Sequence, residues 1–131
     1  MSEPREQPPR QGLRGRLARL AAPQQDLHAQ AERETAARLG GTPIDELPLR
    51  RRATVCGTLR SVTLRPRAGV PALEAEMFDG TGSLSVVWLG RRQIAGVEPG
   101  RRVRVHGMVT DNHGNRVIFN PRYELLPRGA S

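Results

Sequence analysis

From Arg52 onward the chain alternates apolar and polar residues with the period of two that predicts β-strands. The apolar residues occupy odd positions from Val55 to Leu59 and even positions from Val62 to Leu64. Because a regular strand keeps one parity on each face, this switch predicts a bulge or a sharp bend within a long first strand.

Four further strands are predicted, each bounded by glycine, proline, asparagine or aspartate: residues 73–78, 83–89, 103–109 and 117–125. In the second strand the odd-numbered residues from Leu73 to Met77 have the parity expected for the core. Residues 79–82, Asp-Gly-Thr-Gly, are a tight-turn signal before the third strand. Pro121 is expected to interrupt the last strand. Residues 90–97 are too few for a long helix, and one or two helical turns are expected there.

The residues before the strands predict disorder followed by helices. Residues 1–12 are rich in Pro, Gln, Glu and Arg, a composition typical of disorder. Residues 13–22 carry leucines at helical spacing, Pro23 interrupts them, and residues 24–39 predict a second, weakly amphipathic helix. The apolar face of this second helix is thin: Leu27, Ala31 and Leu39. The expected organisation is a disordered tail, a helical extension, a barrel domain and a second tail: residues 1–12, 13–47, 48–127 and 128–131.

These elements have the order that a small closed barrel requires. A long first strand that bends at a bulge can pair in both halves of a barrel and so remove exposed strand edges. Five strands, a short helix between strands three and four, and an N-terminal helical extension predict a mainly β protein built on a five-stranded OB-fold barrel. The five-stranded SH3-like barrel is the main structural alternative, but it does not normally place a helix after its third strand.

Positive charge is concentrated on the predicted barrel. The net charge is +8, and residues 49–131 carry all of it, with fourteen arginines and six acidic residues. Residues 49–71 contain six of these arginines and no acid. A domain this basic attracts polyanions, because each phosphate that it neutralises releases counterions. The alternative is a solvated surface. The absence of lysine indicates a codon bias toward arginine, but such a bias does not explain the excess of cations over acids.

Four stretches, in this order and at these spacings, resemble a known family: RRRATVCGTLRSVTLRPR from Arg50, DGTGSLSVVWLG from Asp79, RRQIAGVEPGRRVRVHG from Arg91 and NPRYEL from Asn120. Residues 47–124 resemble the OB-fold wedge domain of the RecG branched-DNA helicase, and more closely small stand-alone OB-fold proteins of high-GC bacteria. The resemblance implies binding of DNA or RNA. It implies no unwinding, because the motif G-x-x-x-x-G-K-[ST] of a helicase motor needs a lysine, which this chain lacks.

The expected binding site follows from the way OB-folds hold single strands. They bind across strands two and three, between the loop joining strands one and two and the loop joining strands four and five. Here these loops are residues 65–71 and 111–116. The predicted nucleic-acid-binding residues are polar residues of these loops, two aromatic residues and two pairs of arginines: Arg65, Arg67, Asn112, His113, Arg116, Phe78, Trp88, Arg91, Arg92, Arg102 and Arg104.

Parity suggests a role for several of these side chains. Phe78 has the parity opposite to the core of strand two, so it is expected to face outward and stack on a base; the alternative is that it packs under the N-terminal helix. Arg91 and Arg92 directly follow strand three and are expected to hold phosphates. Arg102 and Arg104 alternate with valines and predict an exposed basic stripe.

Other residues are more ambiguous. Trp88 shares the parity of Leu84 and Val86, which favours the core, although its place at the strand end lets the ring reach the rim. Phe119 shares the parity of Val117 and is expected in the core, and Tyr123 is expected to have a structural role and no ligand contact. Glu74 and Glu76 bring negative charge to the expected binding face, where they are predicted to pair with Arg60 or with N-terminal arginines.

Catalytic and metal-binding patterns are not evident. One cysteine, Cys56, excludes an intrachain disulfide and a cysteine-cluster zinc site. His28, His106 and His113 lack the spacing of metal ligands, and Asp79 is a turn residue. We therefore expect no enzymatic activity, no metal and no cofactor.

No apolar run approaches the roughly 20 residues of a membrane span, and the N-terminal residues lack the apolar stretch of a signal peptide. We expect a cytoplasmic protein without a membrane partner. Its function is predicted to be binding of nucleic acid, DNA more than RNA, and single-stranded or branched. The second hypothesis is an adaptor that binds a protein through the barrel and residues 13–47. Steep salt dependence of oligonucleotide binding would favour the first hypothesis.

Overall fold

The computed structural model describes residues 23–127. Within them lie one α-helix, one short 3-10 helix and six strands: α2 (Pro23–Arg38), η2 (Ile44–Glu46), β1 (Arg51–Leu64), β2 (Ala72–Phe78), β3 (Ser83–Leu89), β4 (Arg102–Asn112), β5 (Asn115–Phe119) and β6 (Arg122–Leu125). The expected tails and the first predicted helix fall on residues 1–22 and 128–131, outside the described residues. The prediction of a mainly β protein is confirmed.

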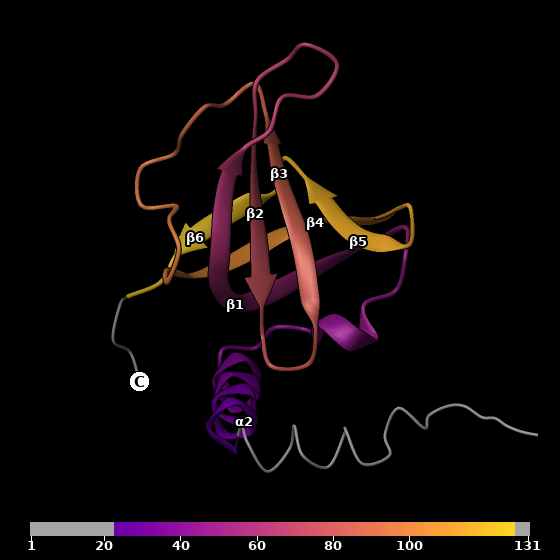
Figure 1. The fold of residues 1–131 in the computed structure, drawn as a ribbon. Helices are drawn as coiled ribbons and strands as arrows, with labels where there is room; N and C mark the ends of the chain where they lie inside the picture. The colour runs from indigo at the N-terminus through magenta and orange to yellow at the C-terminus, as the bar shows by residue number, and fades with distance from the viewer. Residues whose placement is uncertain (1–22, 128–131) are drawn as a thin grey trace, which may run out of the picture.

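β1 closes the sheet into a ring because it pairs at both of its ends. Residues 51–58 are antiparallel to β4, and residues 58–64 are antiparallel to β2. The sheet continues from β2 to β3, from β3 to β5 through parallel pairing, and from β5 to β4. Five strands therefore form a closed sheet, and β6 extends along the edge of β4. Figure 1 shows β2, β3 and the C-terminal half of β1 in front of β4 and β6.

The predicted bend in β1 is confirmed. Its pairing with β2 shifts register between Leu59 and Ser61, which leaves Arg60 as the extra residue of a β-bulge. Gly57 permits a close approach of β2, because a Cβ atom there would lie 2.7 Å from the carbonyl oxygen of Phe78. The bulge and the glycine allow one strand to serve both halves of the barrel.

The barrel core consists mainly of aliphatic side chains from the inner face of each strand in the ring. The predicted core residues of β2 are buried, with Leu73, Ala75 and Met77 exposed by only 4%, 1% and 0%. Burial of one large aliphatic side chain stabilises a fold by about 1.5–3 kcal/mol. This barrel core is therefore the main source of stability for this small domain.

β5 corrects the expectation for Phe119. Ile118 is fully buried in the barrel, whereas Phe119 is 36% exposed on the outer face. Val117 is also outside the barrel core, in a small separate cluster with Ala72 and Val87. Because β5 carries apolar side chains on both faces, its sequence pattern does not identify the inner face.

The segment between β3 and β4 forms turns, and the helix expected at residues 90–97 is absent. Gly90, Gly96 and Gly100 have φ values of +79°, +84° and +90°. These values lie in the left-handed region, so a right-handed helix cannot pass through them. Ile94 and Val97 from this segment are nevertheless buried and join the barrel core. A turn-rich connection thus supplies the apolar side chains that a helix was expected to supply.

The interruption predicted at Pro121 is confirmed, and it divides the last strand into β5 and β6. Asn120 has a φ of +49°. Its backbone N–H donates to the carbonyl of Val87 at 2.7 Å, and its Oδ1 accepts from the N–H of Leu89 at 2.9 Å. These two bonds hold the break in the strand against the end of β3.

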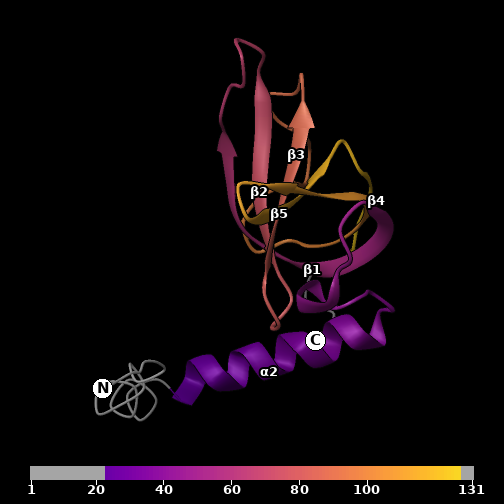
Figure 2. The ribbon, with the colours of Figure 1, turned by 90° about the vertical axis from the view of Figure 1, so that its right-hand side faces the viewer.

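α2 lies across one end of the barrel, beside the β2–β3 turn (Figures 1 and 2). The helix predicted over residues 24–39 is confirmed, but the docked side is not the predicted apolar face, since Leu27 is 65% exposed. Glu32 and Ala36 are instead the buried side chains of α2. Between residues 23 and 127 no helix has the length and apolarity needed to cross a membrane.

Asp79 in the β2–β3 turn connects the segment before β1 to the barrel. Its side chain is only 1% exposed. Oδ1 accepts hydrogen bonds from the backbone N–H groups of Thr81 and Gly82 and from the Thr81 hydroxyl. Oδ2 accepts from the N–H of Ile44 at 2.9 Å, and Thr81 Oγ1 accepts from the N–H of Asp45 at 3.2 Å. The predicted turn therefore also accepts hydrogen bonds from the first two backbone N–H groups of η2.

Candidate nucleic-acid interface

The β1–β2 loop is a tight hairpin that carries the predicted residues Arg65 and Arg67. Arg67 and Val70 exchange two backbone hydrogen bonds of 2.9 Å. Glu74 on β2 lies beside both arginines, with its Oε1 3.4 Å from Arg67 Nη2 and 3.9 Å from Arg65 Nε. Glu74 thus pairs with the loop and not with Arg60, which corrects the expectation. The carboxylate neutralises part of the positive charge of this loop.

Phe119 lies beside the same loop on the outer face of β5. The Cζ atom of Arg67 is 5.5 Å from the centroid of the Phe119 ring, within the range of a cation–π contact. The Nε atom of Arg67 is buried and has no hydrogen-bond partner among the described residues. The loop therefore holds a guanidinium against a partly exposed aromatic ring.

A groove extends from Phe119 across the outer face of β4 and the start of β1. We call it the Phe119 groove; its volume is about 540 Å³, and its lining residues are Arg52, His106, Gly107, Met108, Phe119, Asn120 and Arg122. Strand register explains the convergence, because Arg52 pairs with Met108 and His106 pairs with Arg122. A second hollow of about 360 Å³ adjoins the groove and shares His106 and Arg122 with it.

The charge in the Phe119 groove is not neutralised by nearby carboxylates. Arg52 and Arg122 are exposed, and neither forms an ion pair within residues 23–127. Met108, which is 41% exposed, adds apolar surface between them and Phe119. Arg52 and Arg122 were not among the predicted binding residues, and Phe119 was predicted to lie in the core. The run of arginines at 50–52 was a visible signal, but only strand register shows that Arg52 and Arg122 share one groove.

Arg91 and Arg92 lie at the same end of the barrel as the β1–β2 loop. A hydrogen bond of 2.6 Å from the N–H of Gly90 to the carbonyl of Pro71 joins the segment that carries these arginines to the end of the β1–β2 loop. Both arginines are exposed and form no ion pair in the described part of the chain. The structure therefore brings this predicted pair close to the two loop arginines.

The β4–β5 hairpin holds the remaining predicted loop residues away from the β1–β2 loop (Figure 1). His113 and Gly114 have φ values of +57° and +88° and form a two-residue turn. His113 is exposed and Asn112 is half-buried. Arg116 Nε donates to the carbonyl of Leu47 at 3.2 Å, so this side chain is directed toward the segment before β1. The predicted residues thus do not form one continuous site.

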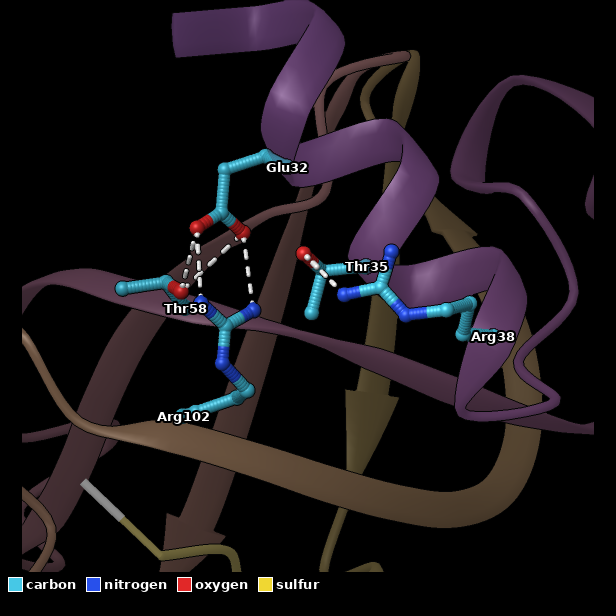
Figure 3. Close-up of polar contacts among 5 residues, drawn as sticks. All are labelled: Glu32, Thr35, Arg38, Thr58 and Arg102. Carbon is cyan, nitrogen blue, oxygen red and sulfur yellow. Dashed lines mark hydrogen bonds and ion pairs between the residues drawn. The ribbon is translucent and has the colours of Figure 1, made fainter. Parts of the chain in front are cut away.

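The basic stripe predicted at Arg102 and Arg104 is not exposed. Figure 3 shows Arg102 beneath α2, where its Nη1 and Nη2 atoms each donate to a different oxygen of Glu32 at 3.2 Å. Thr58 Oγ1 lies 3.1 Å from both oxygens of the same carboxylate. Arg102 leaves the outer face of the strand as its parity predicts, but it is not exposed because α2 covers that face.

Arg104 also has partners within the protein. It pairs with Glu124 of β6 and donates to the carbonyl of Leu39 at 3.2 Å. The hydrogen bond with Glu124 raises the pKa of Arg104. Cys56, opposite Arg104 in register, is buried, and burial raises the pKa of its thiol, although the charge of Arg104 acts in the opposite direction. A buried thiol with a raised pKa is a poor nucleophile.

The two predicted aromatic ligands occupy different environments. Phe78 packs beneath α2, with the ring of His28 stacked at a centroid distance of 6.2 Å and Arg60 Cζ 3.6 Å from the Phe78 centroid. The position of Phe78 therefore matches the alternative hypothesis, that this ring packs under the N-terminal helix. Trp88 is a core residue, 4% exposed and edge-on to Tyr123 at 5.7 Å. Its inner-face parity places the ring inside the barrel, which is the core position that this parity favoured.

Comparison with known proteins finds a likeness to solved structures. No protein-family model matches this chain, and no curated protein matches it. A solved structure, RecG bound to a three-way DNA junction, is similar, with 25% sequence identity and a TM-score of 0.51. The match covers 66% of this chain and 12% of that protein, so the chain corresponds to a small part of it. The predicted likeness to RecG is confirmed at the level of structure.

Proposed function

We propose that residues 48–127 form an OB-fold barrel that binds single-stranded or branched DNA through the Phe119 groove and catalyses no reaction. The observation that carries the proposal is the meeting, in one groove, of an exposed aromatic ring with two arginines that lack a carboxylate partner within residues 23–127. The strand order β1-β2-β3-β5-β4, closed by β1, supports the OB-fold assignment.

Each side chain in the groove has a distinct role in this proposal. Phe119 stacks on a base, while Arg52 and Arg122 contact the neighbouring phosphates. Arg67 fixes the orientation of the Phe119 ring from one side. The similar structure contains a three-way DNA junction, which supports DNA as the ligand and makes a forked oligonucleotide a necessary probe beside a single strand and a duplex.

Replacing Arg52 and Arg122 together by alanine should weaken oligonucleotide binding and reduce its salt dependence. Two lost phosphate contacts should flatten the slope of log K against log salt by about 1.4 for a single strand. The measurement is a fluorescence-anisotropy titration of labelled single-stranded, duplex and forked oligonucleotides at several salt concentrations.

The matched control is Arg33→Ala with Arg38→Ala, which removes the same charge from exposed positions on α2. The control should change the slope much less than the groove variant. A folded groove variant with the affinity and slope of the wild type would contradict the proposal. Binding of a protein partner with little salt dependence would favour the adaptor hypothesis instead.

Replacing Phe119 by alanine should weaken binding to a single strand by about 1–3 kcal/mol without changing the salt slope, because the change removes a stacking ring and no charge. Phe119→Tyr keeps the ring and should bind like the wild type. The same titration measures both variants. Equal affinity of the alanine and tyrosine variants would show that no base stacks on this ring.

A further inference from the structure

Polar contacts, with little apolar contact, hold α2 against the barrel. Leu27 is 65% exposed, and Ala36 is the buried apolar side chain of the described helix. The main contact is the Glu32 carboxylate, to which Arg102 and Thr58 both donate (Figure 3). Because hydrophobic stabilisation scales with the apolar area buried, the docking of α2 depends chiefly on this ion pair.

A ring contact lies one helical turn before the ion pair. The imidazole of His28 is stacked on Phe78 with an angle of 13° between the ring planes. Arg60, the residue of the β-bulge, places its guanidinium over the same phenyl ring at 3.6 Å from the centroid. Phe78 and Arg60 thus form a cation–aromatic pair on the barrel surface, and α2 supplies a flat ring to it.

His28 and Glu32 of α2 offer the barrel the two kinds of group that a nucleotide has, an aromatic ring and an anion. His28 and Glu32 are four residues apart, so their Cβ atoms lie on one helix face about 5–6 Å from each other. His28 offers a planar heteroaromatic ring to Phe78, as a base does. Glu32 offers two anionic oxygens to the guanidinium of Arg102, as a phosphate does.

We propose that the barrel surface beneath α2, formed by Arg60, Phe78, Arg102 and Arg104, is a second binding site for single-stranded nucleic acid, for which α2 competes with the strand. The inference rests on the proposed function. When a strand displaces α2, a phosphate takes the place of the Glu32 carboxylate at Arg102. A base takes the place of the His28 imidazole at Phe78. A strand already held in the Phe119 groove has a high effective concentration at this second site, which favours the exchange.

Glu32→Gln in the full chain tests the competition. The amide removes the charge that holds α2, so the variant should bind a labelled oligothymidine about tenfold more tightly than the wild type at low salt, with a steeper salt slope. Glu34→Gln is the matched control, because it removes the same charge from an exposed position on the same helix. The control should change affinity by less than about twofold, because Glu34 forms no ion pair with the barrel within residues 23–127.

Gly80→Asn provides a second variant that changes no charge. A Cβ atom at Gly80 would lie 2.1 Å from the carbonyl oxygen of Ala29 and 2.7 Å from the nitrogen of Arg33, so the substitution should force α2 away from the barrel. Gly80 has a φ of +91°, and asparagine tolerates positive φ better than most residues. Faster hydrogen exchange in residues 23–38, with protected strands, would report release of α2 from an intact barrel.

Tighter binding by both variants, with faster exchange in α2, is the expected result. Faster exchange without tighter binding would overturn the inference, because the uncovered surface would then bind no strand. Unchanged exchange in both variants would also overturn it, since the docking would not depend on these contacts. If the wild type binds and the variants bind equally well, only the second site fails. If neither the wild type nor any variant binds, the proposed function fails as well.

Discussion

Replacing Trp88 by alanine is expected to lower the free energy of unfolding by about 3–5 kcal/mol, which is a large part of the stability of a small domain. The indole is 4% exposed, belongs to the barrel core and packs edge-on against Tyr123. Its loss leaves a cavity that the strands of a closed sheet cannot readily fill. Urea unfolding followed by circular dichroism measures the change.

Trp88→Phe is the control for both stability and binding. The phenyl ring retains most of the buried volume and removes the indole N–H, which is buried without a hydrogen-bond partner among the described residues. We expect this variant to lose less than about 1.5 kcal/mol of stability and to bind oligonucleotides like the wild type. A folded Trp88→Phe variant with much weaker binding would show that this ring contacts the ligand after all.

Replacing Asp79 by alanine should lower the free energy of unfolding by about 2–4 kcal/mol, because it leaves one buried and three half-buried hydrogen-bond donors without this acceptor. The carboxylate accepts from Thr81 and Gly82 in its own turn and from Ile44 at the start of η2. Urea unfolding gives the total loss. Hydrogen exchange at the Ile44 amide reports whether η2 separates from the barrel.

Asp79→Asn divides this effect into two parts. An asparagine oxygen in the place of Oδ1 still accepts from the turn, whereas the amide nitrogen in the place of Oδ2 cannot accept from the N–H of Ile44. The variant should therefore lose less stability than Asp79→Ala while the Ile44 amide loses its protection. A loss below about 1 kcal/mol for Asp79→Ala would show that other contacts hold η2 in place.

The sequence by itself determined the features that depend on neighbouring residues along the chain. The change of parity between Leu59 and Val62 identified the bulge in β1 before any pairing was known. Alternation identified the inner face of β2, and Pro121 identified the break in the last strand. These predictions succeed because strand direction, turn geometry and the loss of a backbone donor at proline are local properties.

The conformation of the segment between β3 and β4 could not be predicted from its local sequence pattern. Its length and position are those of the expected helical insert, but Gly90, Gly96 and Gly100 adopt positive φ and turn the chain instead. The apolar pattern of Ile94 and Val97 still reports burial. Burial alone does not distinguish a helix from a series of turns, because both can place the same two side chains in the core.

Only the tertiary structure decided which outward-facing residues are accessible. Parity correctly placed Arg102 on the outer face, but Glu32, seventy positions away in sequence, covers it from α2. Phe119 became a surface residue because β5 uses Ile118 for the core. Arg52 and Arg122 share a groove because β4 lies between their two strands. The physical reason is that the direction of a side chain is a property of the local backbone, whereas its exposure and partners depend on segments that folding alone brings together.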